Sequence, residues 1–448
     1  MGKMLVFAIV LSLFTGSNAR SEEISLTVYN NDLAVVKVVD EMTFEKGRQT
    51  KSITGVADQI DPTSVRFTAE KGSIVIIEQN YRYDLVSPQK VLQKYIDRDI
   101  ALRLEQGDFI EGTLQAVSGD VVIKSSDGKL SIVKGDAIER YEFPELPEGL
   151  ITRPTLVWQV YSGKDVTTPA EISYMTQGMS WHAEYTAVVN DDESEIELSS
   201  WVSIDNNSGA SFENATLKVV AGEVHRVTPP APAFRPRMLK AETMADEYEA
   251  GFEERGLFEY HLYELKGQTT VMNAEIKQIS LFEPSVTKAG KLFTYDARKD
   301  AKKVAVKMEF TNSDKDGLGM PLPAGKVRMY KRDTDGALEF VGEDSVGHTP
   351  KNEKVRLTLG NAFDLVGERR IVDTAQISSR IREDTVEIKL RNRKEEPVTI
   401  TAVEYLWGDW EVREKSMDFV KKDAGTIEFT VRVPADGETV VTYTVRYR

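Results

Sequence analysis

The segment TIEFTVRV, residues 426–433, alternates apolar and polar side chains without interruption. Successive side chains of an extended chain point to opposite faces, so Phe429 and its apolar neighbours face one way while Glu428 faces the other. The segment TVEIKLR at 385–391 repeats the pattern, with Ile388 on the apolar face and Lys389 on the polar face. Such alternation predicts β-strands that are buried on one side, and we expect the two apolar rows to pack against each other between two sheets.

The region around these segments contains seven strand-like runs in about 95 residues, the number that an immunoglobulin-like sandwich needs. We therefore predict a C-terminal immunoglobulin-like β-sandwich over residues 351–448, used for contact and not for catalysis. Its expected strands are Lys354–Leu359, Arg370–Ile377, Thr385–Arg391, Val398–Tyr405, Trp410–Arg413, Thr426–Val433 and Thr439–Tyr447.

Helix signals are scarce, and the clearest one begins at Ser87-Pro88, where a capping residue precedes proline at the first helical position. Five short strand-like runs follow it, which predicts a small SH3-like or Sm-like barrel inserted at 88–145. Sm-like barrels bind RNA, so that function has to be weighed. Residues 90–145 hold eight Lys/Arg and eleven Asp/Glu, a net charge of 8 − 11 = −3, and the whole chain carries −15. Such a surface repels a phosphate backbone, so we expect no nucleic-acid partner.

The remaining residues are predicted to form one central β domain, in which the N-terminal segment 20–87 continues into 146–350. Residues 229–256 interrupt the strand pattern because they are rich in Pro, Ala and Glu, and we interpret them as a flexible insertion. Three blocks share a strand–turn–strand plan around Asn206, Asn312 and Asn392, which independent hairpins explain as well as duplication does. The predicted fold class is all-β, with immunoglobulin-like β-sandwich modules, a small SH3/Sm-like barrel and very little helix.

The N-terminus has the features of a cleaved signal peptide over residues 1–19. Lys3 precedes an apolar run from Met4 to Phe14, and Ser17-Asn18-Ala19 places small residues at a cleavage site. The run is too short to cross about 30 Å of hydrocarbon, so we expect an exported protein, periplasmic or secreted, with no transmembrane segment after cleavage. The chain contains no cysteine, which excludes a lipid anchor, disulfides and thiol chemistry.

A search for catalytic, cofactor-binding and metal-binding patterns assigns no residue to any of these roles. The four histidines, His182, His225, His261 and His348, lack metal-ligand spacing, and we expect those beside aromatic residues to be packed. Ser-x-x-Lys pairs occur at Ser87–Lys90, Ser126–Lys129 and Ser285–Lys288, but the partner motifs of penicillin-binding enzymes are absent. The sequence Gly178-Met179-Ser180-Trp181-His182 fails the nucleophile-elbow pattern at its last position.

Two further segments resemble binding motifs, and each has a structural interpretation. Asn312-x-Asp314-x-Asp316-Gly317 imitates the start of a calcium loop, but Pro323 stands where a glutamate ligand is needed, which favours a polar turn. Trp407-Gly408-Asp409-Trp410 has the aromatic residues to stack on a sugar ring. A turn that carries Trp410 into the core is the interpretation we favour, because large aromatic side chains are usually buried.

Several long phrases occur in order from about Leu156 to the C-terminus: ISYMTQGMSWHAEY at 172–185, WV at 201–202, NNSG at 206–209, FENA at 212–215, AGEV at 221–224, FEYHLY at 258–263, PLPAGKVR at 321–328, HTP at 348–350 and GNAFD at 360–364. In these phrases the chain resembles the "domain of unknown function 4139" family, which is related to the mucoidy inhibitor A proteins. The resemblance implies an all-β envelope protein. That family has no assigned catalytic residues, so the resemblance implies none in this chain.

These observations favour a non-enzymatic periplasmic or secreted protein that binds or scaffolds envelope components, either a protein or a polysaccharide. We expect no cofactor. The alternative is an exported hydrolase that acts on envelope polysaccharide or peptide through carboxylates distant in sequence, because paired Asp and Glu residues need no local motif. A pocket that holds two carboxylates about 5–10 Å apart would favour this alternative.

Overall fold

The computed structural model describes residues 22–105, 107–147, 149–222, 224–225 and 252–448. The expected signal peptide and most of the expected insertion at 229–256 lie outside these residues. The last residues of that insertion, from Phe252, already belong to a strand, so the predicted interruption ends earlier than 256.

The described residues form an all-β structure, as predicted. Their helical elements are one α-helix and two short 3₁₀ turns, namely α1 (Pro88–Lys94), η1 (Gly135–Ala137) and η2 (Asp314–Asp316). Ser87 caps α1 by accepting a hydrogen bond from the Lys90 backbone N–H at 3.3 Å, which confirms the predicted helix start. No helix in the described part of the chain is long and apolar enough to cross a membrane.

The central region contains two of the sheets. The larger has seven strands in the order β16 (Phe252–Leu257), β17 (Tyr260–Val271), β15 (Phe212–Ala221), β1 (Glu23–Tyr29), β2 (Leu33–Phe44), β12 (Val166–Thr176) and β4 (Ile60–Ala69). The smaller has the order β3 (Gly47–Thr54), β11 (Thr155–Ser162) and β5 (Ile74–Arg82). Trp158 of β11 meets Phe67 of β4 edge to face, with ring centroids 5.3 Å apart, so the two sheets share one core.

The N-terminal strands pair with strands far along the chain. β1 runs parallel to β15, with Leu26 opposite Leu217, and β2 runs antiparallel to β12. β3 and β5 flank β11. The segment before α1 therefore belongs to the same domain as the chain after residue 150, because its strands pair with strands from that later part.

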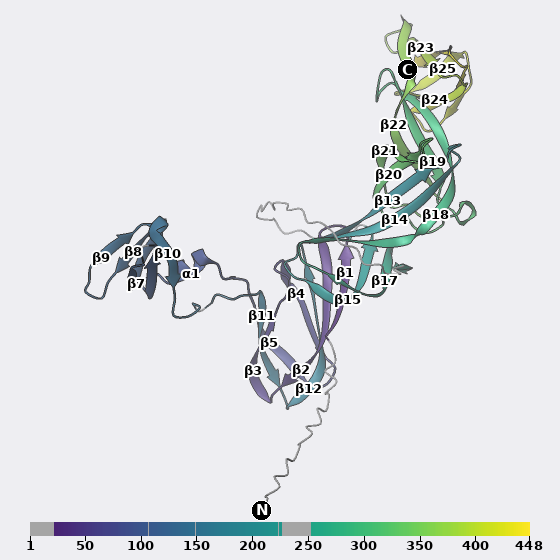
Figure 1. The fold of residues 1–448 in the computed structure, drawn as a ribbon. Coiled ribbons are helices and arrows are strands. Elements are labelled where there is room, and N and C mark those ends of the chain that lie inside the picture. The colour runs from purple at the N-terminus through teal and green to yellow at the C-terminus, as the bar shows by residue number, and fades with distance from the viewer. Residues whose placement is uncertain (1–21, 106, 148, 223, 226–251) are drawn as a thin grey trace, which may run out of the picture.

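The region 88–145 folds as a separate module, which Figure 1 shows standing apart from the other sheets. Its antiparallel strands have the order β10 (Ile138–Glu142), β6 (Asp99–Leu104), β7 (Phe109–Ser118), β8 (Asp120–Lys124) and β9 (Leu130–Val133). Tyr95, which follows α1, is buried against this sheet, whereas the next residue, Ile96, is exposed. The predicted barrel is wrong in one respect, because β9 and β10 remain the two edges of an open sheet among the described residues.

The rest of the molecule is one extended sheet of thirteen strands (Figure 1). Ten strands follow the order β21 (Leu338–Val346), β20 (Gly325–Arg332), β13 (Met179–Val189), β14 (Glu195–Asn206), β18 (Glu275–Asp296), β19 (Lys303–Thr311), β22 (Lys354–Gln376), β23 (Arg382–Asn392), β28 (Gly437–Tyr447) and β25 (Trp410–Lys415). A branch adds β24 (Val398–Tyr405), which pairs with β18, then β27 (Thr426–Val433) and β26 (Phe419–Lys421).

The long strands β18 and β22 connect two hydrophobic cores. The first half of β18 pairs with β14 over the central core, and its second half pairs with β19 and β24 over the C-terminal core. Because Phe293, Tyr295 and Val304 belong to the C-terminal core, that core begins before the predicted boundary at 351. The two strands expected at 354–359 and 370–377 are parts of the single strand β22.

The apolar rows predicted from alternation are buried in the C-terminal core. Ile388 of β23 and Phe429 of β27 are fully buried, whereas Lys389 and Glu428 lie on the opposite faces of their strands. β27 pairs with β24, and β23 pairs with β28, so the two rows come from different layers of the core. The strict alternation therefore reports burial correctly.

The three asparagines that mark the predicted turns are all fully buried and make the same kind of contact. Asn312 donates from Nδ2 to the carbonyls of Met320 and Pro350 at 2.7 and 3.0 Å, and its Oδ1 accepts from the Gly319 N–H. Asn206 likewise donates to three carbonyls and Asn392 to two, and each accepts a backbone N–H from two residues further on. A buried amide must be satisfied in this way, so each asparagine holds a turn together.

Candidate functional site

In the described part of the chain, a line of linked charges crosses β13, β20 and β21, of which β13 is distant in sequence from the other two. The parallel register of β13 and β20 sets Glu184 opposite Lys326, and the antiparallel pair β20–β21 sets Arg328 opposite Glu343. Along β13 the odd-numbered residues are buried, so the even-numbered His182 and Glu184 face outward. The pleat of the sheet thus gathers five polar side chains, which we call the charged strip, on one face: His182, Glu184, Lys326, Arg328 and Glu343.

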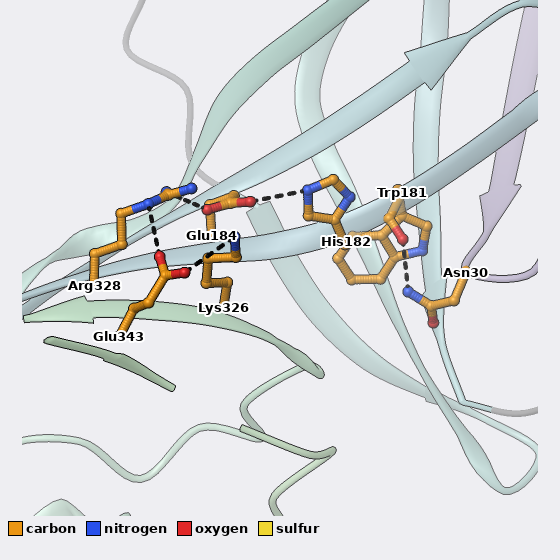
Figure 2. Close-up of polar contacts among 7 residues, drawn as sticks. All are labelled: Asn30, Trp181, His182, Glu184, Lys326, Arg328 and Glu343. Carbon is orange, nitrogen blue, oxygen red and sulfur yellow. Dashed lines mark hydrogen bonds and ion pairs between the residues drawn. The ribbon is translucent and has the colours of Figure 1, made fainter. Parts of the chain in front are cut away.

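Ion pairs connect the whole charged strip (Figure 2). His182 Nε2 lies 3.1 Å from one oxygen of Glu184, and Arg328 Nη1 donates to the other at 2.5 Å. Arg328 Nε lies 3.7 Å from Glu343, which Lys326 approaches to 3.8 Å on its other oxygen. Positive and negative groups therefore alternate across three strands.

Contacts of the backbone and of the inward-facing side chains fix the two strands, β13 and β20, that carry most of the charged strip. Trp181 points to the opposite side of β13 from His182, where its Nε1 donates to the Val220 carbonyl at 3.0 Å. The Trp181 carbonyl accepts from Asn30 Nδ2 at 2.9 Å, which ties β13 to the seven-stranded sheet. Gly325 is required at the start of β20, because a Cβ there would stand 2.0 Å from the Ala183 carbonyl oxygen.

An exposed tryptophan lies beside the charged strip. Trp201 of β14 is directly opposite Glu184 in the β13–β14 ladder, and 44 % of its surface remains accessible. Tryptophan and arginine are the residues most enriched among those that dominate binding energy at protein interfaces. The face therefore combines an aromatic anchor with pre-arranged charges. It forms an open surface, in which Arg328 balances the Glu184 carboxylate.

The histidines that the sequence search considered as metal ligands do not come together in the described residues, where no group of three or more His, Asp and Glu residues could hold a metal ion. His261 pairs with Glu254 at 2.8 Å, and His348 Nδ1 accepts from the Ala324 N–H. His225 itself is exposed and belongs to no helix or strand. The expectation that His182 and His261 are packed is wrong, because alternation turns Trp181 inward and His182 outward.

The other sequence candidates have structural roles in the described chain. Ser87 caps α1, and Asn312 uses its side chain within its own turn. Trp410 packs against the C-terminal core and donates to the Ala424 carbonyl, as the favoured interpretation predicts. Trp407 is exposed and stacks on Tyr447 with ring centroids 4.3 Å apart, which leaves one ring face for solvent.

A cavity of about 270 Å³ lies where the two cores meet along β18, β20 and β22. Glu193, in the turn after β13, forms ion pairs with the ammonium groups of Lys291 and Lys331, the latter at 2.7 Å. Burial opposes ionisation of Glu193, but the two lysines outweigh it and hold the pKa of this carboxyl below its usual value. Glu193 therefore remains an anion near neutral pH.

The sequence did not predict that Trp201, Arg328 and Glu343 lie on one exposed face with the rest of the charged strip. The available signal was the position of Trp201, which the alternation of its strand places on the outer face. Val202 is buried, and Trp201 is exposed. The pairing of β13 with β20 could not be read from the sequence, because the two strands are about 140 residues apart.

These features define an all-β protein of stacked sheets with an exposed charged and aromatic surface. The family model described as "Domain of unknown function (DUF4139)" matches residues 170–406, more than half of the chain, and the protein belongs to this family. No curated protein matches the chain. The charged strip and Trp201 lie within the matched segment, whereas the α1–β10 module lies outside it.

Proposed function

We propose that this chain is an exported, non-enzymatic protein of the cell envelope, which binds a partner protein through Trp201 and the charged strip. The observation that carries the proposal is the exposed Trp201 directly opposite Glu184, within a line of alternating charges. Export rests on the expected signal peptide at 1–19 and on the resemblance to envelope proteins.

The chemistry of the face favours a protein over a polysaccharide as the partner. Lys326 and Arg328 alternate with Glu184 and Glu343, so the charged strip has no net charge apart from His182. Alternating charges fix the register of a partner that carries the complementary pattern, and they disfavour other partners. The five linked side chains are already in place, which lowers the entropy that binding would otherwise cost.

The hydrolase alternative needs a carboxyl group that stays protonated to donate a proton, next to a second carboxylate. The cavity between the two cores is lined by Glu193 and Asp364. Glu193 is unsuited to the acid role, because Lys291 and Lys331 lower its pKa. This cavity therefore does not favour the alternative.

Site-specific photo-crosslinking in intact cells tests the proposed interface. Trp201 would be replaced by p-benzoylphenylalanine, and the exposed Val372 of β22 would carry the same group in a control variant. We expect one discrete protein adduct from position 201 and none of that size from position 372. Combining the position-201 probe with Arg328→Glu should reduce the adduct at least fivefold, while Arg413→Glu on the exposed strand β25 should not.

A purified partner then allows the affinity to be measured directly. Arg328→Glu should weaken binding about 30-fold or more, which corresponds to the loss of about 2 kcal/mol expected of a dominant interface residue. A polysaccharide adduct would contradict the proposed partner class. Equal adducts from positions 201 and 372 would remove the interface altogether.

A further inference from the structure

The cavity between the two cores is lined by apolar and charged residues that take no part in the proposed interface. Its apolar wall includes Phe293, Met308 and Leu359, which come from three different strands. Phe293 belongs to the C-terminal core and Met308 to the central core. The cavity lies where neither core fills the space between them, and it shares no residue with the charged strip.

An irregularity in β22 opens this space. The β19–β22 ladder shifts register between Val306 and Lys307, opposite Gly360 and Thr358. Gly360 has a φ of +155°, a backbone conformation that residues other than glycine rarely adopt, so glycine is needed to form the bulge. Phe363 follows the bulge and is 97 % exposed, although it lines the cavity. An aromatic side chain thus stands at the rim with almost no protein cover.

The cavity carries an excess of positive charge in a chain whose net charge is −15. Its lining includes the three ammonium groups of Lys291, Lys331 and Lys394 and the two carboxylates of Glu193 and Asp364, a net of 3 − 2 = +1. Glu193 pairs with Lys291 and Lys331. Among the described residues, no carboxylate lies within ion-pair distance of Lys394, whose Nζ lies 5.2 Å from the centroid of the Phe293 ring.

We propose that this cavity binds a small monoanion with an apolar body, such as a medium-chain carboxylate. The anionic head group pairs with Lys394 above Phe293, where Lys291 also lies 5.6 Å from the ring centroid. The apolar body lies against Met308 and Leu359, and Phe363 covers it at the rim. A volume of about 270 Å³ lies just below the usual range for drug-sized ligands, about 300–1,000 Å³, and therefore suits a smaller molecule.

Isothermal titration of the purified full chain with sodium octanoate tests the proposal, with octan-1-ol and octylammonium chloride as probes that differ in head group. We expect saturable binding of octanoate at one site per chain, at least tenfold weaker binding of octanol, and none of octylammonium. Equal binding of octanoate and octylammonium would overturn the anion preference. Absence of octanoate binding would overturn the proposal.

Three variants locate the site. Lys394→Gln should weaken octanoate binding about tenfold, whereas Lys389→Gln, which removes an ammonium on β23 outside the cavity, should leave it unchanged. Ala362→Trp should fill the cavity and abolish binding. Phe363→Ala alters a side chain that is almost fully exposed, so it should keep the folded stability and still weaken binding several-fold.

Unchanged affinity in both Lys394→Gln and Phe363→Ala would place the octanoate elsewhere and overturn the proposal. Arg328→Glu, on the charged strip, should not alter octanoate binding. The proposal for the cavity and the proposal for the partner interface can therefore be refuted independently of each other.

Discussion

An arginine–glutamate pair in the C-terminal core contrasts with the arginine–glutamate pair on the outer face of β13 and β20. In the core, Arg369 Nε lies 3.0 and 2.9 Å from the two oxygens of Glu404, whose side chain is 2 % exposed. Tyr443 donates to the same carboxylate at 2.5 Å. On the outer face, Arg328 and Glu184 form a comparable contact, but their side chains are 40 % and 15 % exposed, against 29 % and 2 % for Arg369 and Glu404.

The difference in burial gives the two pairs different roles. A buried carboxylate cannot exchange its partners for water, so Glu404 restricts Arg369 and Tyr443 to one arrangement of the core. Burial, together with the Glu404 charge, raises the pKa of Tyr443 and keeps its hydroxyl protonated as a donor. The exposed pair gains little stability because water and salt screen it. It remains available to exchange its partners for those of a bound protein.

The largest effect is expected from an unpaired charge placed in the same core. Phe429 is fully buried against Phe419 and Tyr443, so Phe429→Asp would bury a carboxylate without a cation and remove an aromatic contact. We expect a loss of more than about 4 kcal/mol and an unfolded C-terminal region. Urea denaturation followed by tryptophan fluorescence, to which Trp407 and Trp410 contribute from this region, measures the loss, and a value below about 1 kcal/mol would show that Phe429 is not packed inside this core.

Removing one partner of the buried pair should cost somewhat less. Arg369→Met leaves the buried Glu404 without its cation, and we expect a loss of about 3–5 kcal/mol in the free energy of unfolding. The double variant Arg369→Met/Glu404→Leu should recover most of that loss, since it leaves no unpaired charge. A double variant as unstable as the single one would contradict the charge-based explanation. Denaturant unfolding of both variants provides the comparison.

The equivalent change in the charged strip should barely alter stability. Arg328→Met removes contacts to Glu184 and Glu343, and we expect a loss of about 0.2–1 kcal/mol that shrinks further in high salt. Thermal unfolding at low and high ionic strength measures both quantities. A loss as large as that of Arg369→Met would mean that the charged strip serves the fold and not a partner.

The smallest effect is expected at Glu428, next to Phe429 in sequence but on the opposite face of β27. Its carboxylate pairs with Lys422 at 3.1 Å. Glu428→Lys exchanges this attraction for a mild repulsion, which should cost less than about 1 kcal/mol. Equal costs for Glu428→Lys and Phe429→Asp would show that the two side chains do not lie on opposite faces of β27.

Much of the local structure could be predicted because it depends on neighbours in sequence. Alternation in 385–391 and 426–433 identified the buried faces, and β24 and β27 have the predicted bounds. Ser87-Pro88 marked the only α-helix in the described residues. Predictions were less accurate where a bend was assumed, since the residues between 359 and 370 continue as one strand that crosses two cores.

The sequence by itself determined the all-β class, the inward face of each alternating strand and the asparagine turns, because a period of two and a turn amide act over a few residues. Tertiary structure alone decided which strands pair. Alternation states which way Glu184 and Arg328 point but not that β13 and β20 adjoin, since any strand can offer its hydrogen bonds to any other. The charged strip, the Glu404 cluster and the cavity between the cores all depend on such pairings, so none of them could be seen before the chain was folded.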